Sequence, residues 1–434
     1  MRGLRGLSQG RYNALAGNVT ARLGALGCLF VATVLLARSG GAAVVGIYAL
    51  LHVLPGLVGT VISAGLPGAV AYFLAGPRRD DRRLPLTLAA IALGGGAAGT
   101  ALWLVAAPLL GHVLFPRVGT ALVLASGGLV LSRLVVTTAK SCSQGANDLA
   151  GSNRVIFTEE FMFLPAYGVL WIAGGRGFAA VILGMLLADA ATASLSWGRL
   201  IRKGFFREAD RPSPALARDI AAYGCRAQVG TVMSQLNLRL DFILLNVITG
   251  PALLGVYAVA SKFAELVRIL GMSLSYVLYP KFARDGRAKA SLNARRIIPR
   301  ALLLTVAIVA PLWALAGFAI PAVYGSAFNG AIVPAQIILL GLALEGVGGV
   351  ITAFLYGVGR PGRNSLAMAG GLTITVLLDL ILIPRYHAVG AATASAAAYL
   401  TTAFALIGFF WWEARSDRIK PWSAKRLSRA DVGT

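Results

Sequence analysis

The sequence predicts an all-α polytopic membrane protein, with about twelve transmembrane helices in two six-helix lobes related by a pseudo-two-fold axis along the membrane normal. Composition is the first reason, because the 434 residues are 57% hydrophobic and only 13% charged, with a mean hydropathy of +0.74. Soluble domains carry about a quarter charged residues. The second reason is that apolar stretches of about 20 residues, enough to cross a bilayer as a helix, recur along the chain. The third is an internal repeat.

The apolar segments are each long enough to span a bilayer. Glycine and proline inside them do not argue against helix, because both are tolerated in transmembrane helices. The first segment is long and lacks a clear small-residue cleavage site, so we expect it to remain as a helix rather than to act as a signal peptide. The predicted spans are residues 14–36, 44–74, 84–108, 120–139, 155–174, 178–198, 220–247, 253–279, 299–323, 331–357, 365–384 and 388–412.

A short phrase occurs twice. "GAAVVGIYALL" begins at Gly41 and "GPALLGVYAVA" begins at Gly250, 209 residues later, and both follow a leucine pair that ends an apolar run. The identical positions are Gly41/Gly250, Ala43/Ala252, Gly46/Gly255, Tyr48/Tyr257 and Ala49/Ala258. Six predicted helices separate the copies, so both run in the same direction, which indicates a parallel internal duplication.

The duplication predicts how the chain is organised. Residues 1–198 form the N-terminal lobe with helices one to six, and residues 220–412 form the C-terminal lobe with helices seven to twelve. Residues 199–219, a polar stretch with two prolines, link the lobes on the cytoplasmic side. Residues 413–434 form a basic cytoplasmic tail. Two such lobes are typical of transporters that rock one half against the other.

The net charge of +23 predicts the orientation. With both termini cytoplasmic, 31 of the 40 Lys and Arg residues fall on the cytoplasmic side and four fall outside. This asymmetry is a positive-inside signal. Basic loops beside anionic lipid head groups then explain the high isoelectric point without a nucleic-acid partner.

The sequence contains no motif for enzymatic chemistry. It lacks a phosphate-binding Gly-rich loop and an HExxH motif, and its three histidines are widely separated. Its three cysteines, Cys28, Cys142 and Cys225, have no near partners and no metal-ligand spacing. We therefore expect no catalytic residues, no metal and no cofactor, and a transporter rather than an enzyme.

Charged residues inside predicted spans are the candidates for a substrate cavity, because each costs about 2.5–3.5 kcal/mol at a helix centre unless it faces water or a partner. The span 220–247 is unusually polar, so we expect it to line a cavity or the lobe interface. The candidate cavity residues are Arg22, Arg133, Arg226, Arg239, Asp241, Lys262, Glu265, Arg268 and Glu345. Cations exceed anions in this set, which favours an anionic substrate, since the planar fork of arginine suits pyrophosphate or carboxylate.

Each candidate also has a structural interpretation. Lys262, Glu265 and Arg268 are three residues apart and share a helix face, so they could form an ion-pair ladder that only holds helices together. Arg226 and Arg239 could pair structurally or extend to the membrane surface, and Asp241 could orient an arginine or carry a proton.

A possible gate involves two of the candidates. An offset near 212 places Arg133 and Glu345 at equivalent positions of the two lobes, which predicts an ion pair that forms across the axis in one transport state. The alternative is that Arg133 lies near the cytoplasmic end of its helix and extends to the surface.

Three stretches resemble a known family: "LNLRLDFILLNVITGPALLGVYAVASKFAELV" at 236–267, "VLYPKFAR" at 277–284 and "FLYGVGRPGRNSL" at 354–366. They look like segments of Wzx-type polysaccharide flippases of the multidrug/oligosaccharidyl-lipid/polysaccharide superfamily. The resemblance implies a flippase that moves undecaprenyl-pyrophosphate-linked oligosaccharide from the cytoplasmic to the outer leaflet of the bacterial cytoplasmic membrane by alternating access. It also implies membrane lipid, a polysaccharide polymerase and glycosyltransferases as partners. By position, Arg226 and Arg239 match the family's cavity-lining stretch.

Other functions stay open. A lipid II flippase is similar but usually has fourteen helices, and multidrug exporters of the superfamily often carry an acidic residue in helix one, whereas residues 14–36 have none. A membrane scaffold of a polysaccharide-synthesis complex, without transport of its own, is the alternative from another class.

Overall fold

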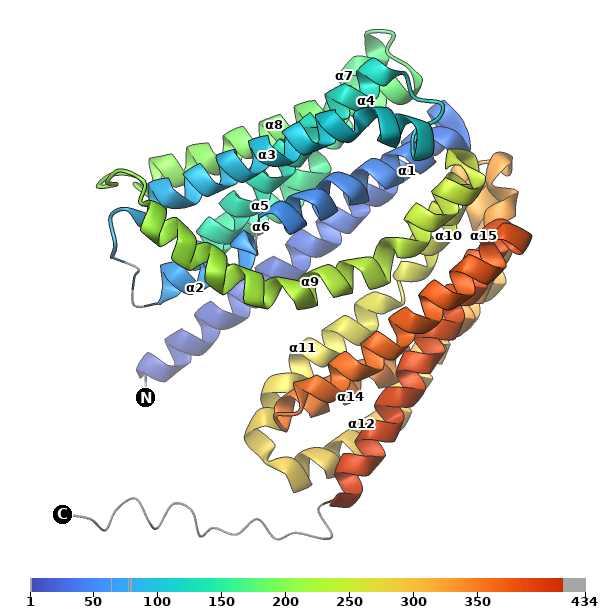
Figure 1. The fold of residues 1–434 in the computed structure, drawn as a ribbon. Helices are drawn as coiled ribbons and strands as arrows, with labels where there is room; N and C mark the ends of the chain where they lie inside the picture. Colours follow the sequence, from blue (N-terminus) through green and yellow to red (C-terminus); the bar gives the residue numbers. More distant parts are fainter. Residues whose placement is uncertain (1, 64, 77, 79, 417–434) are drawn as a thin grey trace, which may run out of the picture. The chain divides into compact units, whose positions relative to one another are not determined.

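The computed structural model describes residues 2–63, 65–76, 78 and 80–416. Helices account for nearly all regular structure in these residues (Figure 1). They form two compact units: unit 1 comprises residues up to Val259 together with Ile320–Asn329, and unit 2 comprises Ala260–Ala319 together with the residues from Gly330 onward. Each unit is described by itself.

Unit 1 is built around α5, which contacts α1, α2, α3, α6 and α8. A buried apolar cluster joins α2, α3, α5, α8 and α9 and includes Leu66, Val70, Leu88 and Ile220. The helices of unit 1 are α1 (Arg2–Ile62), α2 (Leu66–Ala75), α3 (Leu84–Val113), α4 (Thr120–Ser126), α5 (Gly128–Gly145), α6 (Leu149–Phe161), α7 (Phe163–Ile172), α8 (Gly177–Arg202) and α9 (Pro214–Thr249), followed by α10 (Pro251–Glu265), which continues into unit 2.

Unit 2 is centred on α14, which packs against α11 and α15. Its core includes Phe282, Phe354 and Phe410, and the rings of Phe354 and Phe410 meet edge to face with centroids 5.1 Å apart. The elements of unit 2 are α11 (Arg268–Asp285), α12 (Arg287–Tyr324, whose end belongs to unit 1), α13 (Ile332–Gly341), α14 (Glu345–Gly357) and α15 (Pro361–Ser416), with short 3₁₀ segments at Ser326–Ala331 and Leu342–Leu344.

Each of the twelve predicted spans is mostly α-helical, which confirms the all-α polytopic fold. Eight described segments are long and apolar enough to cross a membrane. Two of them lie within α1 and α15, where the backbone turns at Gly41 (φ 73°) and His387 (φ 50°), between consecutive predicted spans. The predicted spans 220–247 and 253–279 are helical but too polar to be among the eight.

The predicted span 44–74 is interrupted by a turn. The prediction of a continuous helix over 44–74 is wrong at its middle, because α1 ends at Ile62 and α2 begins at Leu66 after Gly65, whose φ is 75°. A Cβ at Gly65 would overlap the backbone of Gly224, so the close approach of α9 requires glycine here.

The two copies of the repeated phrase pack against each other within unit 1. Gly41 and Gly250 both break the helix with positive φ, 73° and 87°. A Cβ on Gly46 would overlap the carbonyl oxygen of Pro251, and a Cβ on Gly255 would overlap that of Ala42. The offset of 209 relates Ala42 to Pro251 and Gly46 to Gly255, so each contact is the equivalent of the other. The packing therefore has local two-fold symmetry. Small residues four apart allow this close approach of helices in membranes.

Candidate functional site

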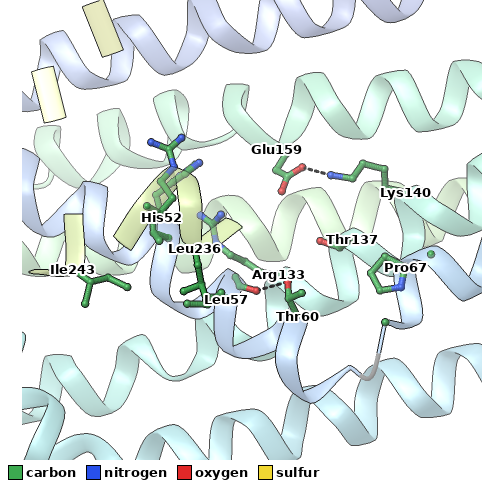
Figure 2. A pocket seen from close by; sticks show the side chains of 15 residues that line it. His52, Leu57, Thr60, Pro67, Arg133, Thr137, Lys140, Glu159, Leu236 and Ile243 are labelled. Atoms are coloured by element: carbon green, nitrogen blue, oxygen red, sulfur yellow. Dashed lines mark hydrogen bonds and ion pairs between the residues drawn. The ribbon is translucent and has the colours of Figure 1, made fainter. Parts of the chain in front are cut away.

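A cavity of about 450 Å³ lies within unit 1. This is within the usual range of ligand pockets, roughly 300–1,000 Å³. Gly56 and Gly68 line it at positions where a Cβ would meet no atom within 4 Å. Its walls come from α1, α2, α5, α6 and α9, and the lining residues are His52, Val53, Gly56, Leu57, Thr60, Gly65, Pro67, Gly68, Arg133, Thr137, Lys140, Glu159, Leu236, Arg239 and Ile243 (Figure 2).

Helix α5 places two cations on one cavity wall. Arg133, Thr137 and Lys140 follow the i, i+4, i+7 spacing that puts side chains on one helix face. Lys140 Nζ lies 3.0 Å from Glu159 Oε2, an ion pair drawn in Figure 2. The sequence shows this spacing, but Lys140 is not among the candidate cavity residues, because it follows the end of the predicted span 120–139.

Arg133 forms an ion pair with an acidic residue of α8. Its Nε lies 3.6 Å from Asp189 Oδ2, and the same oxygen accepts a hydrogen bond of 2.9 Å from Ser132 Oγ. The Asp189 side chain is only 5% exposed, and the Arg133 side chain is 13% exposed. Asp189 therefore offsets the charge of Arg133 while the arginine lines the cavity.

Helix α9 contributes the third cation. Arg239 lines the cavity between Leu236 and Ile243, which lie on the same helix face. Its guanidinium carbon lies 5.2 Å from the ring centre of Phe242. Arg226, on the same helix, belongs to the residues whose side chains lie outside the described part of the chain.

A histidine and a glutamate extend the polar wall. His52 Nε2 lies 3.5 Å from Glu160 Oε1, which joins α1 to α6. Tyr48, one turn before His52, contacts Phe163 with ring centres 4.9 Å apart and ring planes tilted by 38°. Neither His52 nor Glu160 is among the candidates from the sequence, and only the packing of α1 against α6 brings the two side chains together.

Two candidate residues lie outside the lining of the cavity. Asp241 is 6% exposed and accepts a hydrogen bond of 2.5 Å from the hydroxyl of Tyr257 and one of 2.9 Å from the Phe242 N–H. Tyr257 is the repeat's tyrosine, so Asp241 ties α9 to α10. Arg22 is exposed, and its Nε donates to Asn18 Oδ1 over 3.0 Å.

The remaining candidates, Lys262, Glu265, Arg268 and Glu345, belong to unit 2. Arg268 lies over the ring of Tyr399 at 5.5 Å and is close enough to Glu345 and Glu265 for their charges to interact. Glu345 packs against Gly271, where a Cβ would lie 2.7 Å from its Oε1. The structure thus gives Arg133 and Glu345 partners of opposite charge inside their own units, and a gate between these two residues stays a prediction.

The charges of the cavity wall are predominantly positive. Arg133, Lys140 and Arg239 line it, with Glu159 as the single carboxylate among the lining residues. A half-enclosed cavity of this kind attracts anions, and two of its cations are arginines, which bind phosphate oxygens bidentately. Among the residues that the structure describes, no group of three His, Cys, Asp or Glu side chains is placed to hold a metal ion.

The sequence and the fold are similar to those of known proteins. The sequence profile of the polysaccharide biosynthesis protein family matches residues 17–284. A probable low-salt glycan biosynthesis flippase, Agl15 of Haloferax volcanii, is 21% identical over 387 residues, which cover 86% of this chain and 78% of that protein.

Two solved structures share the fold. The lipid II flippase MurJ in an inward closed conformation has a TM-score of 0.75 at 15% identity, covering 93% of this chain and 90% of that one. An inward-facing multidrug resistance MATE family transporter of the MOP superfamily has a TM-score of 0.70 at 15% identity, covering 91% and 96%. Both likenesses confirm the two-lobed transporter fold that the sequence predicted.

Proposed function

We propose that this chain, which belongs to the polysaccharide biosynthesis protein family, is a flippase that translocates an anionic lipid-linked oligosaccharide across a membrane. The substrate we propose is undecaprenyl-pyrophosphate-linked oligosaccharide, moved from the cytoplasmic to the outer leaflet by alternating access. The relative Agl15 is described as a glycan biosynthesis flippase and MurJ as a lipid II flippase, which supports this class of substrate.

The cationic cavity of unit 1 is the observation that carries the proposal. Two guanidinium groups and one ammonium group line it, against one carboxylate. A pyrophosphate carries several oxygens that can each accept charge-assisted hydrogen bonds, and these are about twice as strong as neutral ones. We propose that Arg133, Lys140 and Arg239 engage the pyrophosphate, while Glu159 and Asp189 hold Lys140 and Arg133 in place.

The same charges argue against the multidrug alternative, because a cavity with excess cations repels cationic drugs. A lipid II flippase would also bind a pyrophosphate, so charge alone does not distinguish it from the polysaccharide substrate. The family match favours the polysaccharide.

Lobe motion completes the proposed mechanism. We propose that residues 1–198 and 220–412 act as six-helix lobes joined by residues 199–219, and that rocking of one lobe against the other exposes the cavity to each side in turn. Arg226, Lys262, Glu265, Arg268, Glu345 and the Arg133–Glu345 pair remain candidates for residues that contact substrate or stabilise one state.

Reconstitution tests the function directly. Purified protein in liposomes should accelerate the transfer of fluorescent undecaprenyl-pyrophosphate-linked oligosaccharide to the leaflet reached by an external quencher, compared with protein-free liposomes. The same oligosaccharide on a carrier without phosphate should move no faster than in the protein-free control. A scaffold would move neither substrate, and a multidrug exporter would move a cationic dye instead.

We also propose that the chain lies in a bacterial cytoplasmic membrane with both termini cytoplasmic, beside a polysaccharide polymerase and glycosyltransferases. In a variant without its native cysteines, cysteines at Ser213 and Asn293 should be protected from an impermeant thiol reagent in intact cells, and one at Asn329 should react. The reverse pattern would contradict the proposed orientation and the direction of flipping.

A further inference from the structure

Two tyrosines stack face to face on the surface of unit 1. The rings of Tyr72, on α2, and Tyr223, on α9, have centres 4.2 Å apart and planes within 14° of parallel. Tyr72 is 49% exposed and Tyr223 is 39% exposed. The buried ring of Phe73 meets both of them edge to face, with centres 5.5 and 6.0 Å away. These three rings form one aromatic platform across α2 and α9, with two rings open to a ligand.

The aromatic platform adjoins a wall of the cationic cavity. Gly68 of α2 lines the cavity, and Tyr72 lies four residues later, on the same face of that helix. Gly65 also lines the cavity, and the residue that approaches it closely is Gly224, which is next to Tyr223 in the chain. A ligand that extends from the cavity along α2 therefore meets the platform.

Polar groups border the platform. Asp219 lies one turn before Tyr223 on α9, and its Oδ2 accepts a hydrogen bond of 2.7 Å from Arg78 Nη1. Both side chains of this pair are about half exposed, and the guanidinium carbon of Arg78 lies 5.9 Å from the ring centre of Phe73. A sugar ring has the matching chemistry, because its C–H faces pack on aromatic rings while its hydroxyl groups exchange hydrogen bonds with charged groups.

The size of the cavity indicates that part of an oligosaccharide lies outside it. A volume of about 450 Å³ is at the lower end of the range for pockets that hold one drug-sized ligand. An oligosaccharide of several sugars on a pyrophosphate is larger than such a ligand, so its outer sugars extend beyond the cavity. Helix α2 ends at Ala75, and the residues that follow face the cytoplasm in the proposed orientation, where the oligosaccharide lies before transfer.

We propose that Tyr72 and Tyr223 bind the oligosaccharide by stacking on one of its pyranose rings while the pyrophosphate lies in the cavity. This inference rests on the proposed function and adds a site for the sugar part of the substrate. Exposed tyrosines near a membrane surface also contact lipid head groups. The continuity with the cavity and the bordering pair of Arg78 and Asp219 favour the sugar.

Binding in detergent tests the platform without requiring transport. The probes are undecaprenyl pyrophosphate and the same carrier bearing a tetrasaccharide of N-acetylglucosamine, and native mass spectrometry measures the affinity of the full chain for each. The wild type should bind the tetrasaccharide lipid about threefold to tenfold more tightly, the equivalent of one aromatic stacking contact. Tyr72→Ala and Tyr223→Ala should each remove this gain and bind the bare lipid like the wild type. Tyr72→Phe keeps the ring and should keep the gain.

Tyr386→Ala is the matched control, because Tyr386 is an equally exposed tyrosine, at 59%, on α15. It should bind both lipids like the wild type. Equal binding of the two lipids by the wild type, or an undiminished gain in both alanine variants, would overturn the platform. A loss of affinity for both lipids in the alanine variants would assign the tyrosines to lipid contact and would also overturn it.

The platform and the flippase function can fail separately. A protein that shows the tyrosine-dependent gain but moves no lipid in liposomes would keep the platform and overturn the flippase. A protein that moves the oligosaccharide lipid, but whose tyrosine variants bind it like the wild type, would keep the flippase and overturn the platform.

Discussion

Two turns, one between α5 and α6 and one between α14 and α15, make equivalent backbone hydrogen bonds but carry side chains of opposite charge. In the first turn, the N–H groups of Ala146 and Asp148 donate to Cys142 O and Ser143 O, both over 2.8 Å. In the second turn, the N–H groups of Val358 and Arg360 donate to Phe354 O and Leu355 O, over 2.9 and 2.8 Å. Each of these residues lies 212 positions after its counterpart in the first turn. The residues with positive φ, Asn147 (59°) and Gly359 (72°), also differ by 212.

The side chains of the two turns carry inverted charges. Asp148 accepts two hydrogen bonds from Arg199, of 2.8 and 3.0 Å, and pairs with Lys203 at 2.9 Å. Its counterpart is Arg360, which pairs with Glu413. In both units a turn residue is thus tied to the end of a long helix, α8 or α15.

The same offset of 212 relates Arg133 to Glu345. Arg133 lies beside the acidic Asp189 and Glu345 beside the basic Arg268, so the charges of this pair are inverted as well. Duplication therefore preserves the hydrogen-bonded backbone, while the sign of each charge is free to change as long as a partner changes with it. The consequence for function is that the two halves differ: Arg133 lines an open cavity, and Glu345 packs against Gly271.

The largest difference between the turns should be in the free energy of unfolding that is lost when the carboxylate of each turn, Glu413 or Asp148, is removed. Glu413 is 1% exposed and pairs with Arg287, Arg360 and Arg363. Glu413→Ala leaves these three arginines without their shared partner, and we expect a loss of about 3–5 kcal/mol, typical of a broken buried ion pair. Thermal and denaturant unfolding in detergent measure this. A loss below about 1 kcal/mol would show that the cluster behaves like a surface pair.

Removal of Asp148 should cost less, because Lys203 is 49% exposed and can be solvated after the change. Asp148 also caps α6 by accepting from the Gly151 N–H over 3.0 Å. Asp148→Ala should destabilise by about 1–3 kcal/mol, and Asp148→Asn, which keeps a capping oxygen, by less. If Asp148→Asn and Asp148→Ala are equally destabilised, the cap contributes nothing and the ion pairs account for the whole effect.

The smallest expected effect is the loss, at acidic pH, of the stability that Asp148 contributes. Hydrogen bonds from Arg199 first, then Lys203 and the Gly151 N–H, lower the pKa of Asp148 well below its ordinary value, although burial opposes them. Because the folded pKa is lowered, this stabilisation is complete above the unfolded pKa of about 3.9 and is lost as pH falls from there toward the folded pKa. The difference in stability between wild type and Asp148→Asn should stay constant from pH 7 to about 5 and shrink below about 4. A difference that shrinks already between pH 7 and 5 would contradict the lowered pKa.

The helices and the duplication could be predicted because they depend on local features: apolar length, and glycines at Gly41 and Gly250 that permit positive φ. The bend at His387 falls between the predicted spans 365–384 and 388–412, but its positive φ of 50° was not predicted, because residues other than glycine rarely adopt it. The cationic character of the cavity was predicted from Arg133 and Arg239. The roles of Lys140, His52 and Glu159 depend on which helices pack together, and the sequence alone does not determine this.

Asp241 illustrates the same limit. From the sequence we expected Asp241 to orient an arginine or to carry a proton, and neither expectation pointed to a partner on the following helix. The hydroxyl that it binds comes from Tyr257 on the following helix.

The most direct test of the central claim, that the cationic cavity of unit 1 carries an anionic lipid-linked oligosaccharide, is the liposome transfer rate of Arg239→Gln beside Arg218→Gln. Both changes remove one arginine from α9, but Arg239 lines the cavity and Arg218 is exposed near the start of the helix. Loss of a hydrogen bond to a charged group should lower the rate of Arg239→Gln about ten- to a hundredfold, with Arg218→Gln at the wild-type rate. A folded Arg239→Gln protein that moves the substrate as fast as the wild type would contradict the account.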